Sequence, residues 1–243
     1  MGSLEFINGI ERYCLWIEDH QAELAQSIPA VKRRLDAIVE YRSSGSERGK
    51  LGLATPHRFE RTIVGNATQI IVPRVSSERR PFIPVGLLNS DIIISDAAQA
   101  VYDAPLYVLS IICSQLHLAW VSITAGRMKS DLRYSSGVCY NSFPVPLLTE
   151  KNKSDLKRCA ENILLAREHH FPATIADLYD PQNMPDDLRA AHERNDEVLE
   201  RIYIGRRFKN DTERLEKLFD LYTKMTAAAV PAMAKKRKAG ANA

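Results

Sequence analysis

The feature that most constrains this chain is a change of sequence pattern near residue 150. Before it, short β-branched or aromatic segments alternate with turns that carry glycine or proline, and after it, long polar segments repeat their apolar residues at helical spacing. We therefore expect an α+β fold: a mixed domain over residues 4–150, with mostly antiparallel sheets and helices, and then a small all-α domain over residues 151–228. Residues 229–243, with a basic run at 235–238, predict a disordered tail.

The local pattern predicts individual elements. Strands are expected over residues 11–17, 68–75, 82–88, 91–95, 127–135 and 138–143. The segment 106–124 lacks proline and glycine and is apolar most of the way round, which predicts one buried helix. Further helices are expected over residues 28–41, 154–169, 185–203 and 211–226, with a loop over 43–52.

Composition excludes some classes of protein. The chain of 243 residues is 45% hydrophobic and 26% charged, which is ordinary for a globular protein of the cytoplasm. It has neither a signal peptide nor an apolar run of the roughly 20 residues that span a bilayer, so no membrane partner is expected. Met1-Gly2-Ser3 resembles a leader of the kind added for expression, so the natural protein is expected to start upstream.

Motifs for catalysis are missing from the sequence. It contains no G-x-G-x-x-G, no P-loop, no G-x-S-x-G and no H-E-x-x-H. The four cysteines are widely spaced, which predicts reduced, buried thiols rather than a metal site. His169-His170 at a helix end is better explained as a terminal charge than as a metal ligand pair. We therefore expect no catalytic residue, metal site or cofactor site in this chain.

The most informative stretch covers residues 127–134. In an extended strand, side chains alternate between faces, so Arg127, Lys129, Asp131 and Arg133 would share one face at a spacing of about 7 Å. One interpretation is a solvated sheet face. The other is base recognition, because lysine or arginine donates to guanine O6 and N7 while aspartate accepts from cytosine N4. Lys129 and Asp131 suit that division.

A second stretch, residues 74–80, combines arginines with short hydroxyl side chains. This combination is typical of phosphate binding, and a surface turn with ion pairs is the alternative. The candidate phosphate ligands in the two stretches are Ser76, Ser77, Arg79, Arg80 and Arg127. Asp96 and Ala97 follow the predicted strand 91–95, and by themselves they indicate no more than a helix N-cap.

Several ordered segments together point to a known family. They are Arg-Tyr-Cys-Leu-Trp at 12–16, residues 72–80, residues 82–86, residues 126–135, residues 140–144, and the positions 179–181, 184–185 and 191–192. From about residue 8 to residue 226, the chain resembles the target-recognition region of the MmeI-type (type IIG/IIL) restriction–modification methyltransferases, which modify adenine N6 in DNA. The resemblance implies double-stranded DNA as partner.

The same resemblance implies what lies outside this chain. Full-length members carry an S-adenosylmethionine-binding methyltransferase domain upstream, and often a nuclease domain, which would require Mg²⁺. The catalytic N-P-P-[FY] motif of that family is absent from this sequence, and the Tyr-Asn-Ser-Phe-Pro segment at 140–144 is not a version of it. The chain is therefore expected to be a C-terminal fragment whose partner is the upstream methyltransferase domain of the same natural chain.

The resemblance also assigns base-recognition positions. Arg74 with Asp96 would act on one base pair, and Lys129 with Asp131 on another next to the methylated adenine. Ala97 and Arg133 would act on the base pair between them, Ala97 being too short to reach a base edge itself. Both charged pairs combine a guanine donor with a cytosine acceptor, so we expect each to recognise G·C with guanine on the methylated strand. The competing hypotheses are a protein-interaction module with a solvated charged face, and an enzyme in its own right.

Overall fold

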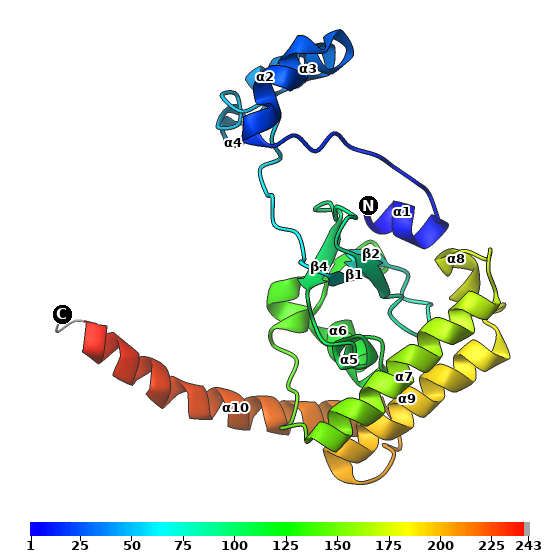
Figure 1. Ribbon diagram of the computed structural model, residues 1–243. Helices are drawn as coiled ribbons and strands as arrows, with labels where there is room; N and C mark the ends of the chain where they lie inside the picture. Colours follow the sequence, from blue (N-terminus) through cyan, green and yellow to red (C-terminus); the bar gives the residue numbers. More distant parts are fainter. Residues whose placement is uncertain (241–243) are drawn as a thin grey trace. The chain divides into compact units, whose positions relative to one another are not determined.

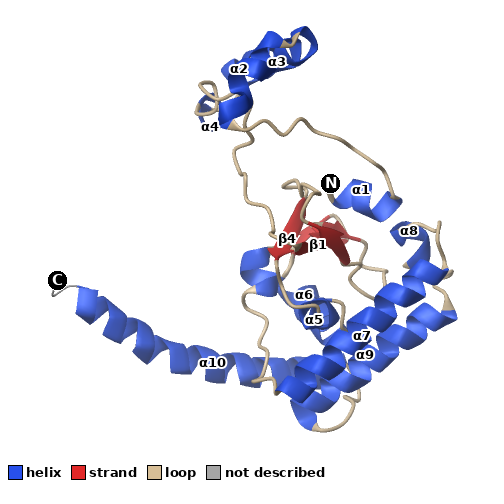
Figure 2. Ribbon diagram, in the orientation of Figure 1, coloured by secondary structure: helices blue, strands red, loops and turns tan. Residues whose placement is uncertain are grey.

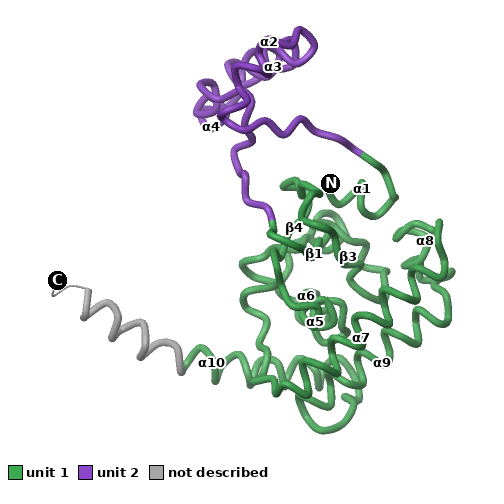
Figure 3. Tube along the Cα trace, in the orientation of Figure 1, with its two compact units in different colours: residues 1–11, 65–243 green, residues 12–64 purple. Residues whose placement is uncertain are grey.

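The computed structural model describes the backbone of residues 1–240 and the side chains of residues 1–227. It divides into two compact units, Met1–Glu11 with Gly65–Ala243 as unit 1 and Arg12–Val64 as unit 2 (Figure 3). Helices dominate, and two small antiparallel sheets accompany them, so the predicted α+β class is confirmed (Figure 2). The side chains of the predicted tail, residues 229–243, lie outside the described part, and its disorder stays a prediction.

The first sheet of unit 1 has the strand order β3-β1-β4, with both pairs antiparallel. Its strands are β1 (Thr68–Pro73), β3 (Gly86–Asn89) and β4 (Ala98–Tyr102). The strand predicted over 91–95 was wrong: the Gln69 side-chain amide donates to the carbonyls of Asn89 (2.9 Å) and Ile92, so this segment is held as a loop. The strand β4 was not predicted, and it pairs along β1.

The second sheet has the order β2-β6-β5 and is also antiparallel. Its strands are β2 (Val75–Ser76), β5 (Gly126–Met128) and β6 (Asp131–Arg133). The strand predicted over 127–135 is therefore a tight hairpin. The strand predicted over 138–143 was also wrong, because Ser136–Tyr140 forms a π-helical turn around the buried Cys139.

The buried helix predicted over 106–124 is two helices, α5 (Tyr107–Ile112) and α6 (Gln115–Thr124). The break lies at Ser114, whose hydroxyl accepts from the backbone N–H of His117 at 3.1 Å and so caps α6. Asp196 strengthens this helix start, since its carboxylate accepts from the backbone N–H of Gln115 at 2.8 Å. A serine at this position ends one helix and begins the next despite the continuous apolar pattern.

The helices predicted for the second part of the chain are present. They are α7 (Glu150–His169), a short α8 (Ile175–Leu178), α9 (Asp186–Ile204) and α10 (Asp211–Gly240). Local signals explain their ends: Thr149 caps α7 by accepting from the N–H of Asn152 at 3.1 Å, and Gly205 ends α9 with a left-handed φ of 78°. Figure 1 shows α7 and α9 running side by side, and they pack against each other.

The core of unit 1 joins the sheets to these helices. One buried cluster contains Ile70 of β1 together with Ile163 of α7 and Leu188 of α9. A second cluster brings Trp120 of α6 together with Leu199 of α9 and Leu218 of α10. The sheets therefore do not close a core of their own, and the helical part of the chain supplies the apolar surface that supports them.

Unit 2 contains helices only: η1 (Asp19–Gln21), α2 (Ala22–Ser27), α3 (Pro29–Ser43) and α4 (Glu47–Lys50). The helix predicted over 28–41 corresponds to α3. The guanidinium of Arg42 donates to the carbonyls of Gly52, Thr55 and Arg58, which orders the polar segment after α3. Residues 11–17 form no strand, so the strand predicted there was wrong.

All four cysteines are free thiols, and three of them are buried as expected, whereas Cys14 is exposed. Burial raises the pKa of the Cys113 thiol to about 12, so that side chain is inert. Among the described residues, no cluster of three histidine, cysteine or acidic side chains could hold a metal ion, and no helix is long and apolar enough to cross a bilayer.

Candidate nucleic-acid interface

Arg74 lies at the junction of the two sheets. It is the single residue between the end of β1 and the start of β2. Its carbonyl accepts from the backbone N–H of Tyr134 at 2.8 Å, so the end of β6 is hydrogen-bonded to the same point. The backbone position of Arg74 is thus set by both sheets at once.

The predicted pair Arg74 and Asp96 is brought together by strand register. Antiparallel pairing of Pro73 with Ala98 places Arg74 beside Ala97 and Asp96, which lie in the loop that precedes β4. Nη1 of Arg74 lies 3.9 Å from Oδ2 of Asp96, and the two side chains are 36% and 93% exposed. An exposed ion pair of this length contributes little stability, so both groups are free to exchange it for a ligand.

The predicted row of four charges on one face was wrong in part. Because the segment is a hairpin, Lys129 occupies the turn, and Asp131 and Arg133 follow it on β6. Asp131 and Arg133 share a face, as alternate residues of a strand do, whereas Arg127 pairs with the buried Leu132 and belongs to the opposite face. The hairpin therefore groups Lys129, Asp131 and Arg133 without Arg127.

Lys129 has a left-handed backbone, with φ of 58°. A side chain at such a position costs about 1–2 kcal/mol relative to ordinary backbone, and glycine avoids that cost. The first turn position of a two-residue hairpin with this geometry usually carries glycine. Lys129 is exposed in its place, and strained residues of this kind cluster at functional sites.

Tyr134, the residue after β6, anchors the hairpin to α6. Its hydroxyl lies 2.9 Å from Nε2 of His117 on α6, and both rings are buried. Burial lowers the pKa of His117 to about 3, so this imidazole is neutral, and burial raises the pKa of the Tyr134 hydroxyl. A neutral hydrogen bond in the core fixes the end of β6 while Arg133, the preceding residue, stays exposed.

The predicted phosphate ligands divide into exposed and enclosed groups. Arg79 is exposed, and within the described residues its guanidinium has no ion-pair partner. Arg127 is instead paired with Glu78 at 3.0 Å and also donates to the carbonyl of Ser130 at 3.0 Å. Of these two arginines, Arg79 has the geometry that suits an external anion.

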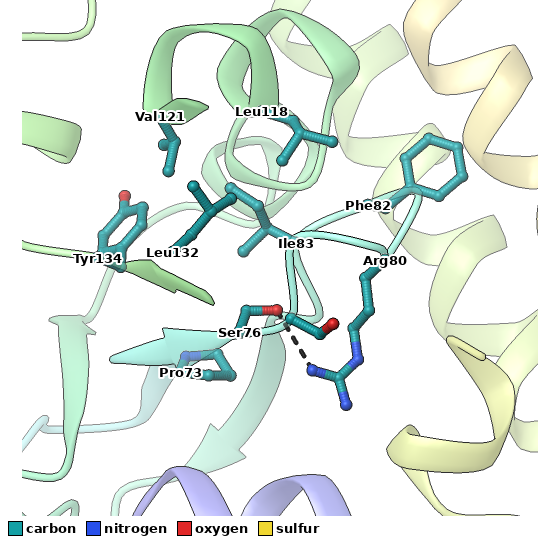
Figure 4. Close-up of a pocket in the computed structure, with 10 residues that line it drawn as sticks. Pro73, Ser76, Arg80, Phe82, Ile83, Leu118, Val121, Leu132 and Tyr134 are labelled. Atoms are coloured by element: carbon teal, nitrogen blue, oxygen red, sulfur yellow. Dashed lines mark hydrogen bonds between the residues drawn. The ribbon is translucent and has the colours of Figure 1, made fainter. Parts of the chain in front are cut away.

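Ser76 and Arg80 face the interior instead (Figure 4). Ser76 is buried, and its hydroxyl lies 3.4 Å from Nη1 of Arg80. Burial lowers the pKa of Arg80, while the carboxylates of Asp131 and Asp180 oppose this shift. Ser77 is half-buried, and its hydroxyl accepts from the N–H of Arg79 at 3.4 Å. Ser76 is therefore unsuited to the predicted phosphate contact, and the half-buried Arg80 is less accessible to a phosphate than Arg79.

The cavity that these residues line is small. Its volume is about 10 Å³, which is room for one water molecule. Apolar side chains from three elements surround it, namely Ile83, Leu118, Val121, Leu132 and Tyr134 (Figure 4). This cavity cannot hold a nucleoside or S-adenosylmethionine.

The exposed candidates follow one order along the surface. Lys129 lies in the turn, Asp131 begins β6, Arg133 ends it, and Arg74 is hydrogen-bonded to the next residue of that strand. Arg133 thus lies between the Lys129–Asp131 pair and the Arg74–Asp96 pair. Ser3 was not among the predicted site residues, because Met1-Gly2-Ser3 was interpreted as a leader. Its hydroxyl contacts the backbone of Arg74 and of Ala97, beside the Arg74–Asp96 pair.

Comparison with known families shows which family the chain belongs to. A family model described as "MmeI, target recognition domain" matches residues 1–147, which is more than half of the chain. The chain belongs to this MmeI family. A second model, "MmeI, C-terminal domain", matches residues 148–230.

Individual relatives agree with the MmeI assignment. DNA methyltransferase A of Bacillus subtilis (strain 168) is 42% identical over 227 residues, which cover 93% of this chain and 26% of that protein. The solved structure of the Type IIL restriction-modification enzyme MmeI in complex with DNA is similar with a TM-score of 0.89 and 31% identity, over 93% of this chain and 30% of that one. The chain thus spans about a quarter to a third of the relatives it matches.

Proposed function

We propose that this chain recognises a specific duplex DNA sequence on behalf of a restriction–modification adenine-N6 DNA methyltransferase. The observation that carries the proposal is the convergence of Arg74 and Asp96, from separate loops, to 3.9 Å with both side chains exposed. A guanine donor beside a cytosine acceptor can contact both bases of one G·C pair in the major groove. The MmeI relative solved with DNA supports the same partner.

The order of residues on the surface supports the remaining assignments. Lys129 with Asp131 forms the second donor–acceptor pair, and Arg133 and Ala97 belong to the base pair between the two. Each pair recognises G·C, with guanine on the methylated strand. Asp131 and Arg133 are alternate residues of β6, and the residue after Arg133 is hydrogen-bonded to Arg74, so the order along the surface matches that of three successive base pairs.

Methyl transfer is assigned to another part of the natural protein. The target base has to leave the helix to reach a catalytic pocket, and the catalytic N-P-P-[FY] motif of the family is absent from this sequence. We place that cofactor in an upstream methyltransferase domain of the same cytoplasmic protein, and Mg²⁺ in its nuclease domain where one is present. A methyl-transfer assay on this chain alone is expected to show no turnover, and any turnover would contradict this division.

The direct test is selection from a random duplex library at low salt, where phosphate contacts retain even weakly bound DNA. We expect the retained duplexes to share a short site that contains two G·C pairs separated by one base pair. Failure to retain any duplex would contradict the proposal and favour a protein-interaction module. Retention without any enriched sequence would limit the function to nonspecific binding.

Replacing Lys129 by glycine should abolish the preference at one base pair. We expect a loss of about 1–3 kcal/mol of discrimination, or about 5- to 150-fold, because the guanine donor is gone. Glycine also relieves the left-handed backbone, so the variant should be at least as stable as the parent chain. Competition between duplexes that differ at that base pair measures the effect, with Lys157→Ala on α7 as control. An unchanged preference would refute the assignment of Lys129.

Replacing Arg79 by alanine should weaken binding to every duplex alike. A lost phosphate contact reduces the slope of log K against log salt concentration by about 0.9. The matched variant Arg127→Ala should change the slope less, since Glu78 already pairs with that guanidinium at 3.0 Å. Salt titrations of binding to one fixed duplex measure both slopes. An equal or larger change for Arg127 would show that Arg79 is not the principal phosphate ligand.

A further inference from the structure

The hydroxyl of Ser3 joins the two chain segments that carry Arg74 and Asp96. Ser3 Oγ accepts from the backbone N–H of Arg74 at 2.8 Å and donates to the carbonyl of Ala97. Arg74 and Ala97 are the next residues after the Pro73–Ala98 pair, where the ladder between β1 and β4 ends. The Ser3 hydroxyl therefore extends the β1–β4 ladder by one step, because its oxygen bridges the N–H of Arg74 and the C=O of Ala97.

The rest of this N-terminal turn is fitted to the same place. The backbone N–H of Ser95 donates to the carbonyl of Met1 at 2.9 Å. Gly2 is buried, and a Cβ on it would lie 2.9 Å from Oγ of Ser95 and 3.0 Å from Cβ of Ala97, which leaves no room for a side chain. The N-terminal turn therefore packs so closely against the 95–97 loop that only glycine fits at position 2.

Helix α1 (Ser3–Asn8) holds the turn in position. It begins at Ser3 and packs against β1 and α8. The ring of Phe6 covers Gly86 of β3 so closely that a Cβ there would overlap it. The N-H of Gly2 donates to Oε2 of Glu5 at 3.0 Å, which fixes the start of the helix. Ser3 is therefore presented by a secured element rather than by a free chain end.

Little else in the structure can set the separation of the two recognition side chains. The contact between Arg74 and Asp96 is 3.9 Å long and largely exposed, so it cannot hold the loops together. Pro73 has no N–H to donate to β4 at the end of the ladder. The Ser3 bridge is the polar link, within the described residues, that ties the Arg74 backbone to the 96–97 loop beyond the paired strands.

We propose that Ser3 is a positioning residue for base recognition, one that sets the distance between the Arg74 guanidinium and the Asp96 carboxylate. The inference rests on the proposed function, because it assigns to Ser3 the geometry of one of the two recognition pairs. Contacts to a G·C pair require both groups in the plane of that pair. Loss of the hydroxyl releases the loop and spoils this alignment, while the Lys129–Asp131 hairpin, which Ser3 does not touch, keeps its geometry.

The test compares base preference at two positions in the 243-residue chain. Ser3→Ala should reduce discrimination at the base pair assigned to Arg74 and Asp96 by about 3- to 10-fold, the size of one lost hydrogen bond. Discrimination at the base pair assigned to Lys129 and Asp131 should not change. Ser3→Thr, which keeps the hydroxyl, should restore the preference. Asn8→Ala is the control, since that side chain only donates to the carbonyl of Leu4 within α1 at 2.9 Å.

Parallel variants separate this inference from the proposed function. Arg74→Ala and Asp96→Asn should each remove discrimination at their base pair. If they do and Ser3→Ala does not, Ser3 has no positioning role and base recognition by the pair stands. If neither variant of the pair alters any preference, both the proposed function of the pair and the role of Ser3 are refuted. An equal loss at both base pairs in Ser3→Ala, accompanied by a lower melting temperature, would reduce Ser3 to a structural residue.

Discussion

Replacing Glu200 by alanine should lower the free energy of unfolding by about 3 kcal/mol, the lower end of the cost of removing one partner of a buried ion pair, because Asp211 still contacts Nη1 of Arg214 at 2.6 Å. The side chain of Glu200 on α9 is fully buried. Its carboxylate accepts from Nε of Arg214 at 2.8 Å and from the backbone N–H of Phe208 at 3.0 Å, and Nη2 of Arg214 lies 2.6 Å away. The Arg214 side chain is only 13% exposed, so water cannot replace the lost carboxylate.

A neighbouring glutamate provides the matched control. Glu197 lies on the same helix and pairs with Arg194 at 2.8 Å and Arg201 at 2.7 Å, but both arginines are well exposed. Glu197→Ala should therefore cost about 1 kcal/mol or less. Urea unfolding followed by circular dichroism measures both variants. Equal losses for Glu197→Ala and Glu200→Ala would show that burial of the pair is unimportant and that the loss of helix propensity explains the effect.

Removing a single oxygen in Tyr179→Phe should cost about 3 kcal/mol, because that hydroxyl serves a buried charge and a buried imidazole. Nε of Arg167 donates to it at 2.8 Å, Nη2 of Arg167 donates to it as well, and it lies 2.7 Å from Nε2 of His192. Burial lowers the pKa of His192 well below its ordinary value, so this ring is neutral, and loss of the hydroxyl removes the partner of its Nε2 together with the acceptor of Arg167.

This network matters beyond α7 and α9, because Nη1 of Arg167 also donates to the carbonyl of Val85 at 2.6 Å, just before β3. It therefore connects the helical part of the chain to the sheet whose strands are flanked by Arg74 and Asp96. Tyr203→Phe is the graded comparison: its buried hydroxyl makes one bond, to the carbonyl of Pro144 at 2.7 Å, and should cost about 1 kcal/mol. Chemical unfolding of both variants measures the two losses in free energy of unfolding. A smaller loss for Tyr179→Phe than for Tyr203→Phe would contradict the role assigned to the network.

Part of the proposed recognition site could be predicted from the local sequence, and part could not. The chemical types at Arg74, Asp96, Lys129 and Asp131 indicated donor–acceptor pairs, and the family resemblance grouped them correctly with the MmeI recognition domain. The pattern could not distinguish a strand from a hairpin at residues 127–134, since two short paired strands alternate in the same way as one long strand. Lys129, which was predicted on a strand face, therefore lies in a turn with a strained, positive φ.

The sequence by itself determined the helices of the second half and the membership of the family. Helices form by hydrogen bonds between near neighbours, and their ends are marked by residues such as Thr149 and Gly205. The strand predicted over 68–75 is present as β1 and β2, but only the tertiary structure decided which strands pair, the meeting of Arg74 with Asp96, the burial of Ser76 and the bridge made by Ser3. Strands and sites of this kind depend on partners far along the chain, and a local pattern holds no information about which partner will arrive.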